Sequence, residues 1–535
     1  MRAVVLPVVL AVVLMAAPVM AAGDGGARWF AHVKELADDK YEGRLTATAG
    51  YDRAADYVAR EFAKAGLQSA GTDGFLQSVA LKEQSLDLAA TTLTLVGPAG
   101  ASALVMADDV LVGTRVPQVK AFDAPLVFLG YGLSLAEQGH DDFAGMDLKG
   151  KIVVTLAGGP RQLSGPLKSH ATRTELWAAM EQAGAVGIMT IANPKSMDVP
   201  WARQKLFAGT PGMRLADPAL NDAKVPFFTA ALNPAAAERL FAASGRSFAQ
   251  MLEIADKGEV LPRFPLNQRL KGVIAATDRD LKSPNVVAML PGRSAALRGE
   301  YVVLTAHLDH LGIGGAVNGD HVYNGAMDNA SGVASLIETA RALKKRTPKR
   351  SVLFVAVTGE ERGLLGSRFY ASRPTVSAGA PLGAIVANIN MDMYLPLWPF
   401  THVTALGGDE STLGPVSAAV AKSLGVMTLP DSEPERNLFV RSDQYSFVRT
   451  GVPALALKFA ASTPEQKAIG KAWLTERYHA PADDINQPIT PAYAAAFNVY
   501  LEKLIRTVAD SEQRPTWNVD SFFRRFEPVG GGSGR

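Results

Sequence analysis

Four apolar segments in the second half of the chain have the pattern of buried β-strands. They are nearly continuous runs of apolar residues, as is typical of strands covered on both faces. The four segments are EYVVLTAHLDH (300–310), RSVLFVAVTGEE (350–361), AIVANINMD (384–392) and VPALALKF (452–459). Between the first two lies SGVASLIETARALKKR (331–346), which has helical periodicity. Its apolar face carries Val333, Leu336, Ile337, Ala340 and Leu343. Alternating strands and helices predict an α/β fold, with a mainly parallel mixed sheet and helices on both faces.

Three of these strands run directly into acidic or histidine residues. The residues at the strand ends are His307 and Asp309, Glu360 and Glu361, and Asp392. Two further motifs, NGAMDNASG with Asp328 and YHAPADD with His479, supply one more carboxylate and one more imidazole. In sheets of this kind ligands bind in the crevice beyond the carboxyl ends of the strands. We therefore expect these side chains to meet at one edge of the sheet.

This set of side chains is suited to a pair of metal ions. Two imidazoles and three carboxylates can hold two divalent cations if one carboxylate bridges them, and one acidic side chain is then left to accept a proton from water. Each motif alone has a simpler explanation, because a His-x-Asp pair can be a buried histidine beside its carboxylate and a Glu-Glu pair can be two solvated charges. Their common position at strand ends favours a two-metal hydrolase.

The chain resembles the co-catalytic zinc aminopeptidases, the family that includes bacterial leucyl aminopeptidase. Glutamate carboxypeptidase and glutaminyl cyclase are more distant relatives. Besides the motifs above, which follow in the family's order, DKYEGRLTATAGYDRAADYVAREFAKAGL (39–67) resembles the family's N-terminal segment. The resemblance implies the zinc exopeptidase fold and two Zn²⁺ per chain, for which Mn²⁺ or Co²⁺ can substitute.

The same resemblance implies a role for each residue of the site. The implied metal ligands are His307 and Asp392 for one ion, Glu361 and His479 for the other, and Asp328 as the bridge. Glu360 is implied to be the general base. The carboxylate of Asp309 is implied to accept a hydrogen bond from His307 and so to fix its tautomer. Tyr478 is implied to donate to the developing oxyanion, an interaction worth roughly 3 kcal/mol, and the alternative is an aromatic ring that only packs beside a ligand.

Some positions depart from the family pattern or have no assigned role. Met327 stands where relatives often have Asp or Asn. His310 and His321 flank the motifs, but the family pattern does not use them as ligands. The segment RSDQYSFVRTGVPALAL resembles the family stretch that lines the substrate cleft. Its cleft candidates are Arg441, Ser442, Asp443 and Tyr445.

The first residues of the chain have the pattern of a secretory signal peptide. Residues 1–22 begin with Arg2, continue with an apolar run from Ala3 to Ala17, and end in small residues around Ala21 that suit cleavage. An uncleaved membrane anchor is the alternative, but the run is shorter than the ~20 residues that a spanning helix needs. We expect export to the periplasm or the extracellular space, with no stable membrane anchor after cleavage.

The middle of the chain has a different pattern, of short strands separated by glycine-rich turns. The segments APLVFLGYG, DLKGKIVVTLAGG and TELWAAMEQAGAVGIMTIANP resemble the protease-associated domain, a small β-rich module inserted into many relatives. The predicted division has four parts. They are a signal peptide (1–22), a discontinuous zinc peptidase domain (23–85 and 280–512), an inserted region (86–279) with the protease-associated core at about 123–235, and a C-terminal extension (513–535) with a flexible Gly/Ser tail.

Composition narrows the function further. The 535 residues, 48% of them hydrophobic, are enough for large cores, and without cysteine there is no disulfide framework and no thiolate ligand. The formal net charge is only +2 and the basic residues are dispersed, which argues against a nucleic-acid partner. No feature of the sequence indicates an oligomeric state.

Three functions are compatible with these motifs. The leading prediction is an exported aminopeptidase that releases N-terminal residues from peptide or protein substrates. The alternative is a carboxypeptidase or another amide hydrolase on the same site, in which Arg436, Arg441 or Lys458 receives a substrate carboxylate. The third is a receptor-like binding protein without activity, which would have lost ligands or the base, whereas all of them are present here.

Overall fold

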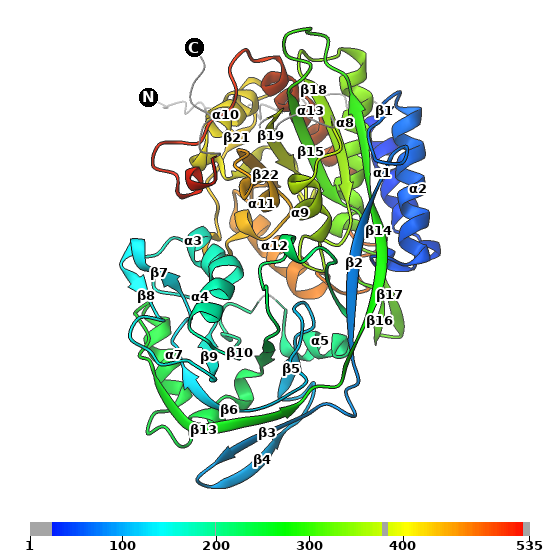
Figure 1. Ribbon diagram of the computed structural model, residues 1–535. Helices are drawn as coiled ribbons and strands as arrows, with labels where there is room; N and C mark the ends of the chain where they lie inside the picture. The colour runs from blue at the N-terminus through cyan, green and yellow to red at the C-terminus, as the bar shows by residue number, and fades with distance from the viewer. Residues whose placement is uncertain (1–23, 198, 377–383, 528–535) are drawn as a thin grey trace, which may run out of the picture.

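Two β-sheets organise the chain in the computed structural model, which describes residues 24–197, 199–376 and 384–527 (Figure 1). The larger sheet has ten strands. In spatial order its main path is β11 (Gly212–Leu215), β2 (Leu76–Leu86), β14 (Ala276–Leu290), β18 (Ser351–Val357), β15 (Tyr301–His307), β19 (Ile385–Asn390), β22 (Ala454–Phe459), β20 (His402–Leu406) and β21 (Met427–Thr428), and β1 (Gln68–Ser69) pairs with β14. The predicted signal peptide, residues 1–22, lies outside the described residues.

The centre of the larger sheet is parallel. Strands β18, β15, β19 and β22 pair in parallel, with Leu304 of β15 opposite Phe354 on one side and Ile389 on the other. Antiparallel pairs flank this centre, β14 with β18 and β20 with β22. The four strands predicted from apolar runs are confirmed, and they form the parallel centre of the sheet.

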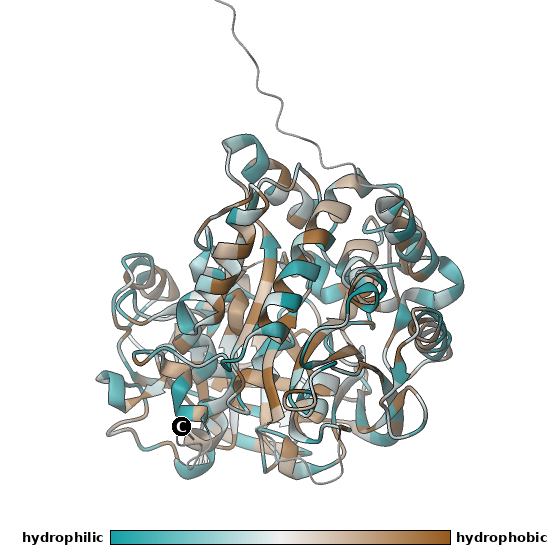
Figure 2. Ribbon diagram, turned by 90° about the horizontal axis from the view of Figure 1, so that it is seen from above, coloured by the Kyte–Doolittle hydropathy of each residue, from teal (hydrophilic) through white to brown (hydrophobic). Residues whose placement is uncertain are grey.

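Helices cover both faces of the larger sheet, as predicted. One face packs on α1 (Gly25–Leu36), α2 (Ala49–Lys64), α8 (Ser331–Lys345), α10 (Leu413–Ser423) and α13 (Pro491–Asp510), and the other on α9 (Leu365–Ser372) and α11 (Gln444–Val448). Alternate residues of a strand serve alternate faces: Val302 and Leu304 lie in the first core and Val303 in the second, all completely buried. Seen from above, apolar strands lie between helices that also present hydrophilic turns (Figure 2).

A smaller, eight-stranded sheet lies below the larger one in Figure 1. Its spatial order is β4 (Gly100–Leu104), β3 (Thr92–Gly97), β13 (Phe264–Val273), β6 (Ala121–Phe128), β9 (Ile152–Leu156), β10 (Gly187–Ile191), β12 (Phe228–Leu232) and β5 (Val110–Val112). Its helices are α3 (Gly165–His170), α4 (Leu176–Gln182), α5 (Trp201–Gln204), α6 (Glu238–Phe241) and α7 (Phe248–Asp256). Residues of its strands form a hydrophobic core of their own.

The long strands β2 and β14 connect the two sheets. They pair in antiparallel register from Leu76 opposite Val286 to Leu86 opposite Ala276, and the smaller sheet is built from the chain between them. Strand β11 departs from this division, because Met213 pairs with Glu83 of β2 in the larger sheet. Part of the region predicted as an insert, 86–279, therefore completes the larger sheet.

The C-terminal segment contacts both parts of the molecule. Trp517 and Phe523 are buried in a cluster with residues of the larger sheet's side, and Phe522 packs against the core of the smaller sheet. The Gly/Ser tail, 528–535, lies outside the described residues.

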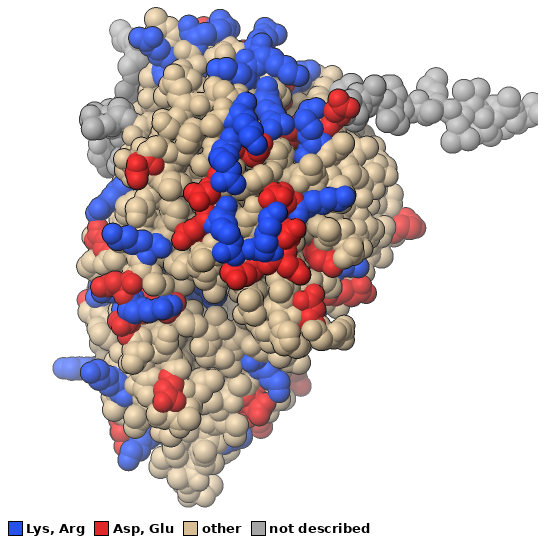
Figure 3. Space-filling view, turned by 90° about the vertical axis from the view of Figure 1, so that its right-hand side faces the viewer, with Lys and Arg blue, Asp and Glu red and all other residues tan. Residues whose placement is uncertain are grey.

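Of the helices that the structure describes, none combines the length and the apolar character needed to cross a membrane. Figure 3 shows Lys, Arg, Asp and Glu side chains interspersed on one face of the molecule.

The remaining elements complete the surroundings of the site. Strands β16 (Gly312–Val317) and β17 (Asp320–Tyr323) form a hairpin between β15 and α8, and β7 (Ser134–Leu135) pairs with β8 (His140–Asp141) in the smaller part. Helix α12 (Pro464–Glu476) precedes the YHAPADD motif. Its first turn is fixed by Thr463, whose hydroxyl accepts the N–H of Gln466, with proline at the first helical position.

Candidate metal centre

All the residues predicted at the strand ends except Asp309 line one small cavity. His307 ends β15, Glu360 and Glu361 follow β18, and Asp392 follows β19. The cavity has a volume of about 70 Å³. All five predicted ligands line it together with the predicted base and Tyr478: His307, Asp328, Glu360, Glu361, Asp392, Tyr478 and His479. Segments far apart in the sequence thus bring seven polar side chains together.

The carboxylate of Asp328 lies between two groups of nitrogen and oxygen atoms. Its Oδ1 is 3.2 Å from Nε2 of His307, which is 3.5 Å from Oδ1 of Asp392. Its Oδ2 is 3.4 Å from Nε2 of His479, which is 3.3 Å from Oε2 of Glu361. Two ligands about 2.0–2.2 Å from a tetrahedrally coordinated zinc ion lie roughly 3.3 Å apart. Both groups therefore fit a divalent metal ion, with Asp328 shared between them.

The loop that carries Asp328 is fixed by a residue that the sequence did not single out. The carboxylate of Asp483 accepts the N–H groups of Met327 and Asp328, at 2.9 and 3.0 Å. Gly325 begins this loop with a φ of +60°, and a Cβ there would lie 2.1 Å from the carbonyl oxygen of Asp328. The loop accordingly needs glycine at this position. Asp483 lies in the YHAPADD motif, four residues after His479, and this closeness in sequence to a predicted ligand could have identified it.

Arg44 ties two ligand-bearing loops together. Its side chain is completely buried and donates hydrogen bonds to the carbonyl oxygens of Leu308, at 2.9 Å, and of Asn324 and Gly325, at 2.6 and 2.9 Å. These carbonyls lie next to His307 and just before Asp328 along the chain. Arg44 belongs to the segment 39–67 that resembles the family's N-terminal segment, but no single-residue signal marked it.

Asp309 orients the site in a different way from that implied by the resemblance. Nδ1 of His307 lies 3.0 Å from the main-chain carbonyl of Asp309 and not against its carboxylate. The carboxylate instead accepts the N–H groups of Glu360 and Glu361, at 3.0 and 3.3 Å, and the hydroxyl of Thr46 at 3.0 Å. The turn after β18 leaves those two N–H groups without a strand partner, so a buried carboxylate is the acceptor they need. The implied acceptor was wrong, although a carbonyl fixes the imidazole tautomer equally well.

Electrostatics inside the cavity favour bound cations. Burial lowers the pKa of His307, but the carboxylates of Asp328 and Asp392 outweigh it and raise that pKa well above its ordinary value. Burial likewise lowers the pKa of His479, and the carboxylates of Glu361 and Asp328 raise it to about 10. Protons on these imidazoles balance the buried negative charge. A metal ion that binds here must displace them.

Glu360 and Tyr478 line the cavity without belonging to either ligand group. Burial raises the pKa of Glu360 well above its usual range, and the charge of Asp443 adds to this while His307 opposes it. The ring of Tyr478 packs on that of His479, with the centroids 3.9 Å apart. Burial also raises the pKa of Tyr478, so its hydroxyl keeps its proton and can donate it in a hydrogen bond.

His310 lies closer to the site than the family pattern implies. Its Nδ1 is 3.0 Å from Oε1 of Glu361 and 3.9 Å from Oδ2 of Asp328, and its side chain is completely buried. The two oxygens of Glu361 thus face different histidines, Oε1 facing His310 and Oε2 facing His479. His310 can donate a hydrogen bond that orients Glu361, or it can itself act as a ligand. His321 lies on β17 with an exposed side chain.

Only two of the four cleft candidates line the cavity. Arg441 and Ser442 do so, whereas Asp443 and Tyr445 do not. Asp443 is completely buried, and burial raises its pKa to about 7. The hydroxyl of Tyr445 is hydrogen-bonded to Nδ1 of His170, on the side of the smaller sheet. Tyr445 therefore links the two parts of the molecule and does not reach the metal site.

Residues 285–504, which contain all the predicted ligands, match the model described as Peptidase family M28. This part of the chain is therefore similar to that family. Two curated relatives are the "Probable zinc metalloprotease" of Pyricularia oryzae, 38% identical over 102 residues (19% of this chain and 20% of the relative), and "Aminopeptidase YwaD" of Bacillus subtilis, 28% identical over 189 residues (35% and 36%). The chain thus spans well under two thirds of the length of either relative.

The fold of the chain is also found in a solved structure. The "Aminopeptidase from Aneurinibacillus sp. strain AM-1" superposes with a TM-score of 0.53 at 18% identity, over 93% of this chain and 97% of that one. At this identity the likeness concerns the fold. It extends beyond residues 285–504 and so includes most of the described residues.

The roles of His310 and His479 can be separated by substitution. Because His479 approaches both Glu361 and Asp328, we expect His479→Gln to lose one of two bound metal ions. His310→Gln should keep both ions, with an affinity for the second reduced about 10- to 100-fold through the loss of an orienting hydrogen bond. Metal analysis after equilibrium dialysis measures both. If His310→Gln loses an ion while His479→Gln keeps two, His310 is the ligand.

Proposed function

We propose that this protein is a two-zinc metallopeptidase that releases residues from the N-termini of peptides. The observation that carries this proposal is the Asp328 carboxylate, shared between a His307–Asp392 group and a Glu361–His479 group. The similarity of residues 285–504 to peptidase family M28 and the names of the relatives, a zinc metalloprotease and an aminopeptidase, support it. Mixed nitrogen and oxygen ligands suit zinc, and manganese or cobalt could take its place.

The chain supplies the groups that peptide-bond hydrolysis needs. When bound, the two zinc ions would supply Lewis acidity and lower the pKa of a water molecule. Glu360 would accept a proton from the attacking water and deliver it to the departing amine. Its burial supports that assignment, because a carboxyl of raised pKa can both take up and hold a proton. Tyr478 would donate a hydrogen bond to the oxygen of the attacked carbonyl.

The alternative is a carboxypeptidase, which needs a cation for the terminal carboxylate of its substrate. Arg436, Arg441 and Lys458 all line the metal cavity. However, Nζ of Lys458 already donates to the main-chain carbonyls of Asp392 and Met393. Arg441 and Arg436 are therefore the remaining candidates to bind the terminal carboxylate of a carboxypeptidase substrate. A receptor-like protein without activity is disfavoured, because the complete ligand set and Glu360 surround one cavity.

We also propose the division of the chain and its location. Residues 86–279 would be a module inserted into a peptidase domain of residues 23–85 and 280–512, with a protease-associated core at about 123–235 and a C-terminal extension at 513–535. The separate sheet between β2 and β14 supports the insertion, although β11 lies in the larger sheet. Residues 1–22 would direct export, which would bring the enzyme to peptides of the periplasm or the medium.

The direction of cleavage tests the proposed function. We expect purified protein with zinc to release leucine from Leu-Ala-Ala, because the free N-terminus marks the substrate of an aminopeptidase. The N-acetylated peptide should not be cleaved. Mass spectrometry of the products measures this, with enzyme treated with a chelator as the control. Release of C-terminal alanine from the acetylated peptide would instead establish the carboxypeptidase.

Glu360 and Glu361 are neighbours with different proposed roles. Glu360→Gln keeps the size of the side chain but removes the basic oxygen, so kcat should fall about a hundredfold to ten-thousandfold with both metal ions retained. Glu361→Gln is the matched control and should lose a metal ion, because that side chain is a proposed ligand. Steady-state kinetics and metal analysis of both variants decide the matter. Near-normal kcat in Glu360→Gln would contradict the assignment.

A further inference from the structure

A large cavity leads away from the metal centre along the inserted region. Its volume is about 530 Å³, and it begins at Glu361, His479 and Arg441, which also line the metal cavity. Apolar side chains line much of the remainder. They include Leu86, Leu88, Met106, Val110, Val112 and Phe207. A substrate whose reacting bond lies at the metal centre therefore has an open, largely apolar path toward the inserted region.

Arginine side chains gather beside the metal-centre end of this path. Arg115 and Arg362 line the 530 Å³ cavity and also a second cavity of about 330 Å³, to which Arg173 contributes. Three more arginines line the second cavity and are paired with acids: Arg214 with Asp278, and Arg368 and Arg449 with Asp222. Among the described residues, no acidic side chain forms an ion pair with Arg115, Arg173 or Arg362. We call these three residues the arginine cluster.

Arg362 is the most enclosed member of the arginine cluster. Its side chain is only 9% exposed, and its Nε has no hydrogen-bond partner among the described residues. A buried N–H group without a hydrogen-bond partner is costly, because it has lost its hydrogen bond to water without replacing it. Arg115 lies beside it and donates through Nη2 to the carbonyl oxygen of Glu361, at 2.7 Å. The cluster is therefore adjacent to the main chain of a proposed metal ligand.

The charges in this region are not balanced by the protein. Burial lowers the pKa of Arg173 to about 10, with the positive charges of Arg441 and Arg115 adding to the effect, although its side chain remains open to solvent. Glu360 and Glu361 are the acids that act on Arg115, and Asp309 and Glu83 also act on Arg362. Metal ions at the site would take up the charge of Glu360 and Glu361. The arginine cluster would then keep a positive potential at the wall of the 530 Å³ cavity.

We propose that the arginine cluster binds a carboxylate of the substrate, on the part of the peptide that follows the cleaved bond. This inference rests on the proposed function and assigns a substrate class to it. Guanidinium groups bind carboxylates through paired, charge-assisted hydrogen bonds. The 530 Å³ cavity, which Glu361 and Arg115 both line, would hold the residues that follow the cleaved bond. The carboxylate is either the free C-terminus of a short peptide or an acidic side chain.

Two peptide pairs distinguish these sources. Leu-Ala-Ala is compared with its C-terminal amide, and Leu-Glu-Ala-amide with Leu-Gln-Ala-amide. In one of the two pairs, we expect the peptide with the carboxylate to be cleaved with a kcat/KM about ten- to a hundredfold above that of its neutral counterpart. The difference should come mainly from a lower KM, because charge-assisted hydrogen bonds strengthen substrate binding. A preference in the first pair identifies the C-terminus, and one in the second identifies an acidic side chain.

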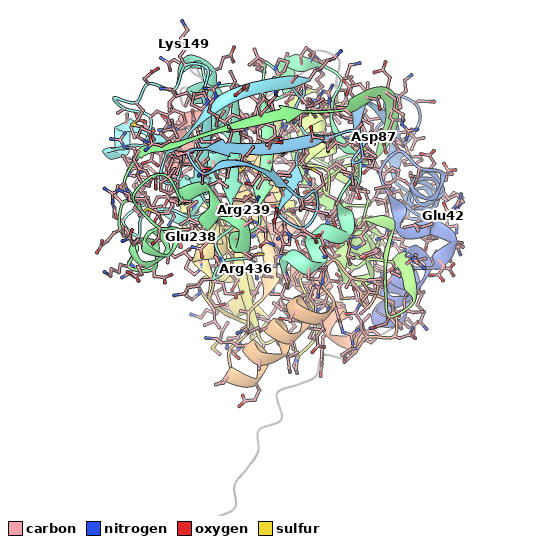
Figure 4. The ribbon with its side chains drawn as sticks, turned by 90° about the horizontal axis from the view of Figure 1, so that it is seen from below. Glu42, Asp87, Lys149, Glu238, Arg239 and Arg436 are labelled. Carbon is pink, nitrogen blue, oxygen red and sulfur yellow. The ribbon has the colours of Figure 1, made fainter. Side chains whose placement is uncertain are left out.

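Variants of the cluster connect the preference to these residues. Arg115→Met and Arg173→Met alter exposed side chains, and each should bring the ratio of kcat/KM within the preferred pair close to one. Arg362→Lys, which keeps the charge at the buried position, should retain part of the preference. Lys149→Met is the control, since Figure 4 shows Lys149 at the outer edge of the inserted region, and it should leave the ratio unchanged. Bound zinc is measured in every variant to verify folding.

The outcomes separate this inference from the proposed function. If acid and neutral peptides of both pairs lose their N-terminal residue with equal kcat/KM, the arginine cluster binds no substrate carboxylate, and the proposed function stands. A preference that survives unchanged in Arg115→Met and Arg173→Met also overturns the inference. If no peptide is cleaved by the zinc-loaded protein, the proposed function fails and this inference fails with it.

Discussion

The burial of several carboxylates in one small cavity is the constraint on which the rest of the structure depends. Asp328, Glu361 and Asp392 meet Glu360 around about 70 Å³, and like charges at this separation repel one another strongly in surroundings that exclude water. His307 and His479 offset part of that charge. Two divalent cations would offset it more completely, and the spacing of the ligand atoms suits them. Hydrogen bonds fix the loops that carry these side chains. Arg44 donates to their carbonyl oxygens, and the carboxylates of Asp309 and Asp483 accept their N–H groups.

Residues 86–279 contribute to the surroundings of this cavity. Arg115 donates to the carbonyl of Glu361, and Arg203 donates to that of Tyr478 at 2.8 Å. His170 contacts Tyr445, and its ring also packs against Phe522 and Phe526 of the C-terminal segment, with centroids 5.3 and 5.5 Å apart. Three distant parts of the chain therefore fix the position of the arginines relative to the metal centre. A substrate that passes through the large cavity touches both the peptidase part and the inserted region.

Much of this arrangement could be predicted from the sequence because it follows from local patterns. Continuous apolar runs marked the four parallel strands, and their ends marked His307, Glu360, Glu361 and Asp392. What failed depended on contacts between distant segments. The acceptor for His307 is a carbonyl because the turn after β18 occupies the carboxylate of Asp309. Strand β11 has only four residues and is defined by its pairing with β2, far away in the chain. Arg44 and His310 carry no pattern of their own.

In the proposed metal centre, two metal ions share the carboxylate of Asp328. Anomalous X-ray diffraction from crystals of the purified protein, measured on either side of the zinc absorption edge, tests it most directly. We expect two zinc peaks per chain on opposite sides of the Asp328 carboxylate, one against His307 and Asp392 and the other against Glu361 and His479. A single peak, or peaks that do not contact Asp328, would contradict it.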